Sequence, residues 1–93
     1  MRVTVELYFP ERRKLPREPL VLELPEGADV IAAIEALVER FPFLRTRLYD
    51  GRGRLQRFVS ALVDGTSIQF LRGFSTPLAE GSRLTLLPPV GGG

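Results

Sequence analysis

Apolar and polar residues alternate along the first nine residues of the chain. One phase of this two-residue repeat holds the apolar residues Val3, Val5, Leu7 and Phe9. The pattern is typical of a strand with one buried face. Residues 20–24, LVLEL, alternate in the same way after a segment at 10–19 that contains three prolines and four basic residues. The sequence therefore predicts two strands joined by a long loop, as in a hairpin.

The period changes to that of a helix between residues 26 and 41. The apolar residues that recur at helical spacing are Val30, Ile31, Ile34, Leu37, Val38 and Phe41. Asp29 is placed to cap the start of this helix by accepting from free backbone N–H groups, and Pro42 disfavours its continuation. Pro42 is also suited to open a second, short helical turn through Leu44 and Leu48.

The second half of the chain returns to strand patterns. Residues 58–63, FVSALV, are followed by Asp64-Gly65, a pair that suits a two-residue hairpin turn with positive φ at both positions. Residues 67–71, SIQFL, are expected to form the returning strand, and residues 82–87, SRLTLL, form the last one. The order predicts an α+β domain over residues 1–87: a β-grasp arrangement, with a mixed sheet of four to five strands packed on one main helix.

Composition narrows the chemistry that this chain can perform. Its 93 residues suffice for one hydrophobic core, and its 44% hydrophobic and 26% charged residues are typical of a soluble globular domain. Cysteine and histidine are both absent, which excludes disulfides, thiolate metal sites and the usual general base. We therefore expect no metal site and no catalytic residues of its own. The N-terminus lacks the pattern of a signal peptide, which favours the cytoplasm.

The chain ends in LTLLPPVGGG, an ending that folding alone does not require. Pro88 and Pro89 cannot donate to a sheet, so the ladder is predicted to stop at Leu87 and residues 88–93 to form a flexible tail. Glycines without a Cβ fit a channel too narrow for side chains. The terminal carboxylate is inert until an ATP-using partner converts it to an acyl-adenylate. The alternative is a frayed terminus without a function.

Residues 57–93 resemble the C-terminal part of the MoaD/ThiS family of ubiquitin-like sulfur carriers, which includes the small subunit of molybdopterin synthase. The matching pieces are VDG at 63–65, IQFLRGFSTPL at 68–78, EGSRL at 80–84 and LPPVGGG at 87–93. The N-terminal half matches in pattern through PEGADVIAAIEALVERFP, residues 25–42. The resemblance thus extends over the whole chain and is most specific in its last part.

The resemblance implies a β-grasp fold and a reactive C-terminus. Gly93 would bear the adenylate and then the sulfur, as a thiocarboxylate, and Gly92 would lie beside it in the channel of the partner. Pro88, Pro89 and Val90 would form the emerging stalk. Gly91 departs from the family pattern, because relatives often have alanine there. The implied partners are an adenylating enzyme of the ubiquitin-activating type, which uses ATP, and a sulfurtransferase or cysteine desulfurase; the chain itself would bind no cofactor.

The acceptor of the sulfur is a separate question. The ending LPPVGGG together with FLRGFSTPL looks most like the molybdopterin branch, in which the partner is the large subunit of molybdopterin synthase. RFVSALVDG also resembles carriers that serve cysteine biosynthesis. Other relatives serve thiamine synthesis or tRNA thiolation, or are attached to protein lysines as modifiers.

Tyr8 and Leu87 are expected on the outward phase of two neighbouring strands. An exposed pair of this kind, extended by Phe70 or Phe74, would make an apolar docking patch near the root of the tail. The alternative is that Phe70 belongs to the core. Two basic stretches, in residues 10–19 and 43–57, are consistent with a nucleic-acid surface, but they lack aromatic interleaving and are interpreted as solvated faces.

Overall fold

A computed structural model of the protein describes residues 1–17, 19–56 and 59–88, with the side chain of Glu11 outside the description. Its strands are β1 (Arg2–Leu7), β2 (Leu20–Glu23), β3 (Ser60–Val63), β4 (Thr66–Ser67) and β5 (Arg83–Leu87). Its α-helices are α1 (Val30–Arg40) and α2 (Arg45–Leu48), and short 3-10 helices lie at η1 (Pro10–Lys14), η2 (Pro42–Leu44), η3 (Ile68–Phe70) and η4 (Gly73–Ser75). Within the described ranges, no helix is long and apolar enough to cross a membrane.

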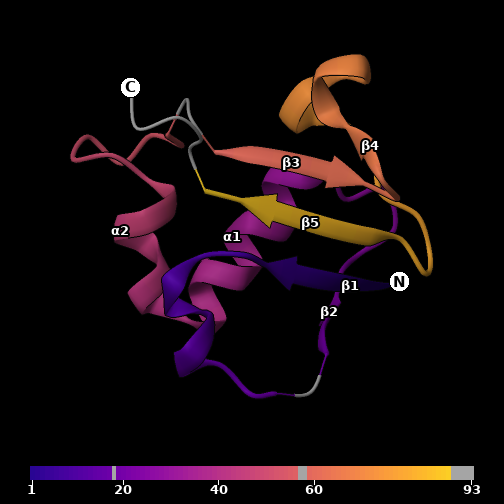
Figure 1. Ribbon diagram of the computed structural model, residues 1–93. Coiled ribbons are helices and arrows are strands. Elements are labelled where there is room, and N and C mark those ends of the chain that lie inside the picture. The colour runs from indigo at the N-terminus through magenta and orange to yellow at the C-terminus, as the bar shows by residue number, and fades with distance from the viewer. Residues whose placement is uncertain (18, 57–58, 89–93) are drawn as a thin grey trace.

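The five strands form one mixed sheet in the order β2-β1-β5-β3-β4 (Figure 1). The first and last strands, β1 and β5, lie side by side in its centre and run parallel, with Val5 opposite Leu84. The other neighbouring strands pair antiparallel. The predicted hairpin of β1 and β2 is confirmed, and so is the mixed five-stranded sheet of the β-grasp fold.

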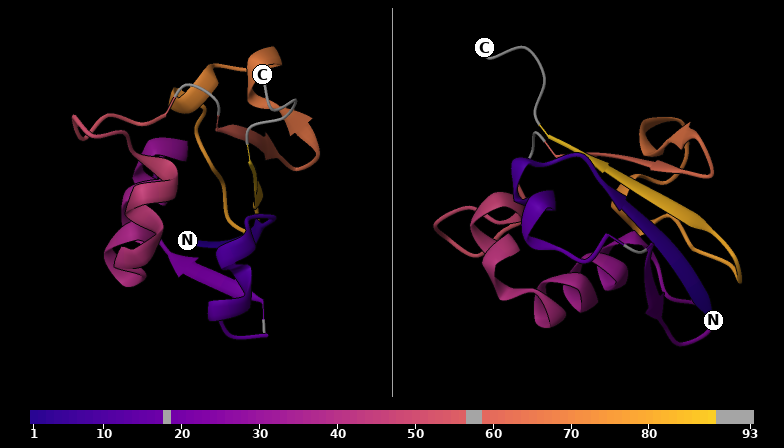
Figure 2. Two further views of the ribbon diagram at one scale, coloured as in Figure 1. Left: turned by 60° about the vertical axis from the view of Figure 1, so that its left-hand side comes forward. Right: turned by 60° about the horizontal axis from the view of Figure 1, so that its bottom comes forward.

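One face of the sheet packs against α1, and α2 lies on the same side (Figure 2). Alternation along the strands turns Val3, Val5 and Leu7 of β1 inward, as well as Leu84 and Leu86 of β5. They join one core, whose most deeply buried large members also include Val30, Ile34, Leu37, Val38, Leu44 and Leu48. On the opposite face, Thr4 and Glu6 of β1 are half-buried and Thr85 of β5 is buried.

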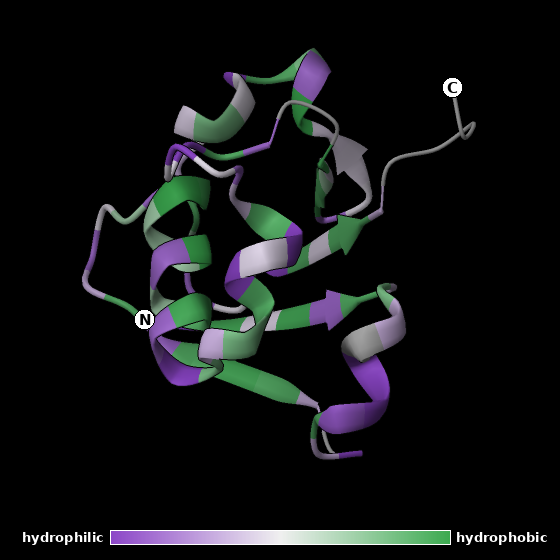
Figure 3. Ribbon diagram, turned by 90° about the vertical axis from the view of Figure 1, so that its left-hand side faces the viewer, coloured by the Kyte–Doolittle hydropathy of each residue, from purple (hydrophilic) through white to green (hydrophobic). Residues whose placement is uncertain are grey.

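Helix α1 starts and stops where its sequence dictates. The Asp29 side chain accepts a hydrogen bond from the Ala32 N–H at 2.9 Å, which satisfies one of the free donors of the first turn. Pro42 follows the end of the helix and opens η2, which leads into α2 as expected. In Figure 3 the ribbon of α1 carries both hydrophobic and hydrophilic residues, and its buried residues recur at helical spacing, as in an amphipathic helix.

Two predicted elements differ from the structure. The returning strand expected at 67–71 ends at Ser67, because the Ser67 hydroxyl accepts from the Gln69 N–H at 3.2 Å and turns the chain into η3. The loop at 10–19 contains η1, which Pro10 opens because its fixed φ suits a first helical position. The hairpin turn is confirmed, with φ of 50° at Asp64 and 86° at Gly65. The predicted first residue of β3, Phe58, lies outside the described residues.

Helix α1 offers a direct test of the core. Replacing buried Leu37 by alanine should lower the free energy of unfolding by about 2–5 kcal/mol, because the packed core cannot collapse around the missing atoms. Ile31→Ala on the exposed side of the same helix is the matched control and should cost about 1 kcal/mol or less. Urea denaturation followed by circular dichroism measures both, and equal losses would contradict this assignment of the helix faces.

Candidate functional site

The root of the tail is fixed by the pairing of β5 with β1. The Tyr8 N–H donates to the Leu86 carbonyl at 3.1 Å, which extends the parallel ladder one residue beyond β1. The strand β5 ends at Leu87, as predicted, and Pro88 follows. Pro89, Val90, Gly91, Gly92 and Gly93, the rest of the predicted tail and its reactive end, lie outside the described residues. The structure therefore locates where the tail begins.

Tyr8 and Leu87 lie at this end of the sheet on neighbouring strands, as the sequence predicts. Leu87 is half-buried, and Ser60 of β3 lies opposite it on the other side. The Tyr8 side chain is 58% exposed, which is unusual for a large aromatic residue next to a sheet centre. The exposed ring is thus available to a partner that approaches the tail.

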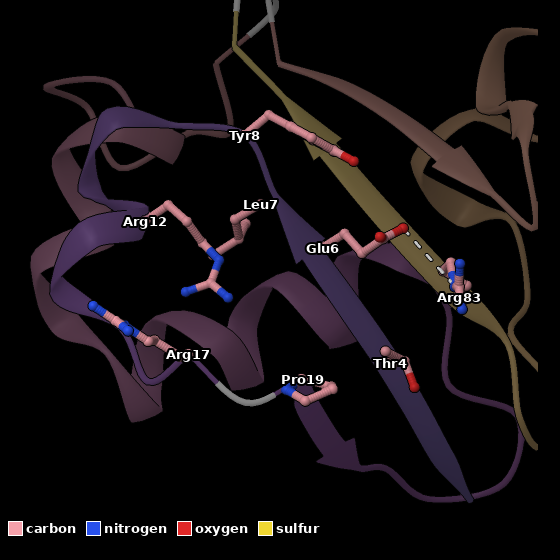
Figure 4. Close-up of a pocket in the computed structure, with 8 residues that line it drawn as sticks. All are labelled: Thr4, Glu6, Leu7, Tyr8, Arg12, Arg17, Pro19 and Arg83. Atoms are coloured by element: carbon pink, nitrogen blue, oxygen red, sulfur yellow. Dashed lines mark ion pairs between the residues drawn. The ribbon is translucent and has the colours of Figure 1, made fainter.

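A groove runs beside Tyr8 along the outer side of β1. Its volume is about 310 Å³, and its lining consists of Thr4, Glu6, Leu7, Tyr8, Arg12, Arg17, Pro19 and Arg83. Figure 4 shows Arg12 and Arg17 on the side of the 10–19 segment and Glu6 and Arg83 on the side of the sheet. Sequence reasoning missed this groove, because the chain segments that form its walls are far apart in sequence.

The charges on the sheet side of the groove balance each other. The Glu6 carboxylate lies 3.8 Å from the Arg83 guanidinium and accepts from the Thr85 hydroxyl at 3.3 Å. On the opposite side, Arg12 donates to the backbone carbonyl of Pro16 at 2.8 Å, a bond that holds the side chain without neutralising its charge. The described lining residues, with three arginines and one glutamate, therefore have an excess of positive charge.

Phe70 and Phe74 are held in different environments by the turns of η3 and η4. The Phe70 side chain is 81% exposed, so the interpretation as a core residue is wrong for it. Phe74 is half-buried against the core and lines a smaller hollow of about 140 Å³ with Ser60 and Ala61 of β3. Phe74 thus lies beside the strand that pairs with Leu87, whereas Phe70 projects into solvent.

The turn that carries Phe74 is tied by side-chain hydrogen bonds. The Thr76 hydroxyl donates to the Gly73 carbonyl at 2.7 Å and accepts from the Arg72 N–H at 3.0 Å. Thr76 is buried, so these bonds are shielded from water. A fixed turn reduces the conformational entropy that Phe74 would lose on contact with a partner. The docking roles predicted for Phe70 and Phe74 remain predictions.

The second basic stretch is organised by one carboxylate. Asp50 accepts from the backbone N–H groups of Arg52 at 2.8 Å and Arg54 at 3.0 Å. These bonds, that of Arg54 first, lower the pKa of the Asp50 carboxyl below that of an ordinary aspartate. Burial, and to a lesser degree the Glu35 carboxylate, raise the pKa of the Tyr49 hydroxyl against the opposing effect of Arg45. The only sequence signal for this arrangement is the DGRGR run after Tyr49.

No metal centre emerges from this arrangement. Among the described residues, no group of three or more acidic side chains is placed to hold a metal ion. The described surface near the tail therefore offers aromatic contact, arginine side chains and one compensated carboxylate. These features are suited to recognition of a partner, and the chemistry predicted for this chain rests on its terminal carboxylate.

Comparison with known proteins agrees with this geometry. The sequence pattern described as the ThiS family matches residues 7–93. A relative, the sulfur carrier protein CysO of Mycobacterium tuberculosis, is 36% identical over 69 residues, which are 72% of this chain and 74% of CysO.

Two solved structures share the whole fold. SAMP1 from Haloferax volcanii superposes with a TM-score of 0.83 at 25% identity and 100% coverage of both chains. A putative molybdopterin converting factor, subunit 1, from Pyrococcus furiosus superposes with a TM-score of 0.69 at 26% identity, covering 96% of this chain and 98% of that one.

The Asp50 hydrogen bonds predict a specific pH dependence. Because the folded pKa lies below the unfolded one, ionised Asp50 stabilises its loop at neutral pH, and this contribution is lost as the pH falls through the folded pKa. The amide shifts of Arg52 and Arg54, followed by NMR from about pH 6 to pH 2, should titrate below the midpoint of an aspartate in an unstructured peptide. Asp50→Asn should abolish this titration. An unshifted midpoint would contradict the assignment.

Proposed function

Because the chain belongs to the ThiS family, we propose that it is a sulfur carrier whose terminal Gly93 is adenylated and then converted to a thiocarboxylate. The observation that carries this proposal is the end of β5 at Leu87, beside exposed Tyr8 and ahead of a sequence of two prolines and three glycines. A central strand that leads directly into such a sequence anchors the reactive end to the domain.

The proposed chemistry proceeds in two steps on the partner. The Gly93 carboxylate attacks the α-phosphorus of ATP, so that an acyl-adenylate forms and pyrophosphate leaves. A persulfide (R–S–S⁻) carried by a sulfurtransferase or cysteine desulfurase then attacks the carbonyl carbon; a C–S bond forms and AMP leaves. A thiol attacks the outer sulfur of the resulting acyl disulfide, so that the S–S bond breaks, the thiocarboxylate leaves and a new disulfide forms with the donor. The adenylating enzyme binds the ATP and excludes water from the adenylate. This chain acts as the covalent substrate, and its folded domain provides recognition.

Molybdopterin synthesis is the first proposed use of the sulfur. The support is the resemblance of LPPVGGG and FLRGFSTPL to that branch and the likeness to the molybdopterin converting factor subunit of Pyrococcus furiosus. In this case the chain would be the small subunit beside a large catalytic subunit. Cysteine biosynthesis is the second, supported by the 36% identity to CysO. The likeness to SAMP1, a small archaeal modifier protein, supports a third use, attachment to lysines as a protein modifier.

The sulfur-carrier proposal is tested by intact-mass analysis. After incubation with ATP, a sulfur source and the adenylating enzyme of the same organism, the chain should gain about 16 mass units, because sulfur replaces one carboxylate oxygen. A variant without Gly92 and Gly93 is the matched control and should gain none. Failure of the natural chain to gain this mass, or activation that survives the deletion, would refute the proposal.

The acceptor is tested with the thiocarboxylated chain. Offered separately to a molybdopterin synthase large subunit with its pterin precursor and to a cysteine-forming enzyme with an activated serine, it should lose the added mass of about 16 units in only one reaction. Conjugation predicts instead higher-mass species in cell extract that vanish when Gly93 is deleted. Because Lys14 is the only lysine, the chain would form few conjugates with itself.

A further inference from the structure

The groove beside Tyr8 adjoins the root of the tail. Tyr8 lines the groove and is bonded through its backbone N–H to Leu86, one residue before β5 ends. The six residues after Leu87 span at most about 20 Å when extended. A protein that receives Gly93 in its active site therefore lies close to this groove. The groove is well placed to help recognise that protein.

Arg12 and Arg17 have no carboxylate within ion-pair distance among the side chains that the structure describes. Among the described lining residues, the one carboxylate is that of Glu6, and it is paired with Arg83. An occupant that brings two negative charges to Arg12 and Arg17 would complete the charge balance of the groove.

The rest of the lining favours a protein segment over a nucleic acid. Pro19 and the exposed Tyr8 ring provide apolar contact area, and exposed tyrosine with arginine is a combination enriched at protein interfaces. A continuous chain of phosphates would also place negative charge beside the Glu6–Arg83 pair, which is already balanced. Aspartate or glutamate side chains can instead reach Arg12 and Arg17 individually and leave Glu6 with Arg83.

We propose that the groove lined by Tyr8, Arg12 and Arg17 binds an acidic segment of the adenylating enzyme that takes up the tail. This inference rests on the proposed function, because it identifies the surface of the carrier that this enzyme recognises. Arg12 and Arg17 pair with carboxylates of the segment, and Tyr8 packs against its apolar part. The groove sets the approach of the enzyme, and the tail alone enters its active site.

The test measures binding without ATP, so that no adenylate forms. The full chain and its Arg12→Gln/Arg17→Gln variant are titrated by calorimetry into the adenylating enzyme of the same organism at about 50 mM and about 500 mM salt. The double substitution should raise Kd about tenfold at low salt and much less at high salt, because the charges are then screened. Tyr8→Ala should raise Kd at both.

The matched control removes two arginines outside the groove. Arg2→Gln/Arg72→Gln lowers the net charge equally and should change Kd by less than about twofold. Thermal unfolding of each variant verifies that the fold is retained, because Arg12 also bonds to Pro16. Equal Kd values for the natural chain and the Arg12→Gln/Arg17→Gln variant would overturn the proposal. So would a loss of binding to total tRNA in that variant while its Kd for the enzyme stays unchanged.

The docking proposal and the sulfur-carrier proposal can be refuted independently of each other. If the natural chain gains sulfur but the Arg12→Gln/Arg17→Gln variant binds the enzyme equally well, the docking proposal is wrong and the sulfur-carrier proposal stands. If the natural chain gains no sulfur but its binding shows the expected dependence on Arg12 and Arg17, the sulfur-carrier proposal is wrong and the docking proposal stands.

Discussion

The parallel pairing of β1 with β5 is the constraint on which the rest of the structure depends. It places the first and last strands of the chain in the centre of the sheet, with Leu84 and Leu86 fully buried over α1. Because the strands run in the same direction, the residues that follow both leave the sheet at the same end. The segment containing Arg12 and Arg17 and the start of the tail therefore become neighbours.

This arrangement separates stability from recognition. The inward phase of the strands packs on α1 and forms one core, and the outward phase is free to carry Glu6, Tyr8 and Leu87. A partner can contact this outer face without disturbing the core. The tail begins at the end of a strand that is paired on both sides, so its root is held in a fixed position relative to the groove.

Much of the fold follows from the sequence, because the signals are local. Alternation identified β1, β2 and β5, and Asp29 with Pro42 bounded α1. The strand expected after Asp64-Gly65 was too long, because a single hydroxyl, that of Ser67, diverts the backbone by a bond that a residue pattern does not reveal. The order of the strands in the sheet cannot be predicted from the sequence of any single strand. It was predicted from the simplest way to pack the elements around one helix and from the family resemblance.

The candidate site was predictable only in part. Tyr8 and Leu87 were found because their strand phase and the expected neighbour relation were both correct. The groove escaped prediction because Arg12 and Arg17 come from a proline-rich loop whose path depends on tertiary contacts. For Phe70 the sequence left two possibilities open. Its apolar character suggested the core as an alternative to an exposed position, and η3 turns it outward.

The most direct test of the sulfur-carrier account is fragmentation mass spectrometry of the full chain purified from its own cells. The account predicts a fraction of molecules in which an increase of about 16 mass units is confined to the terminal fragment that contains Gly93. A terminus that is an unmodified carboxylate in every molecule, in cells shown to contain the active adenylating enzyme and sulfur donor, would contradict it. The same mass increase located at any other residue would contradict it as well.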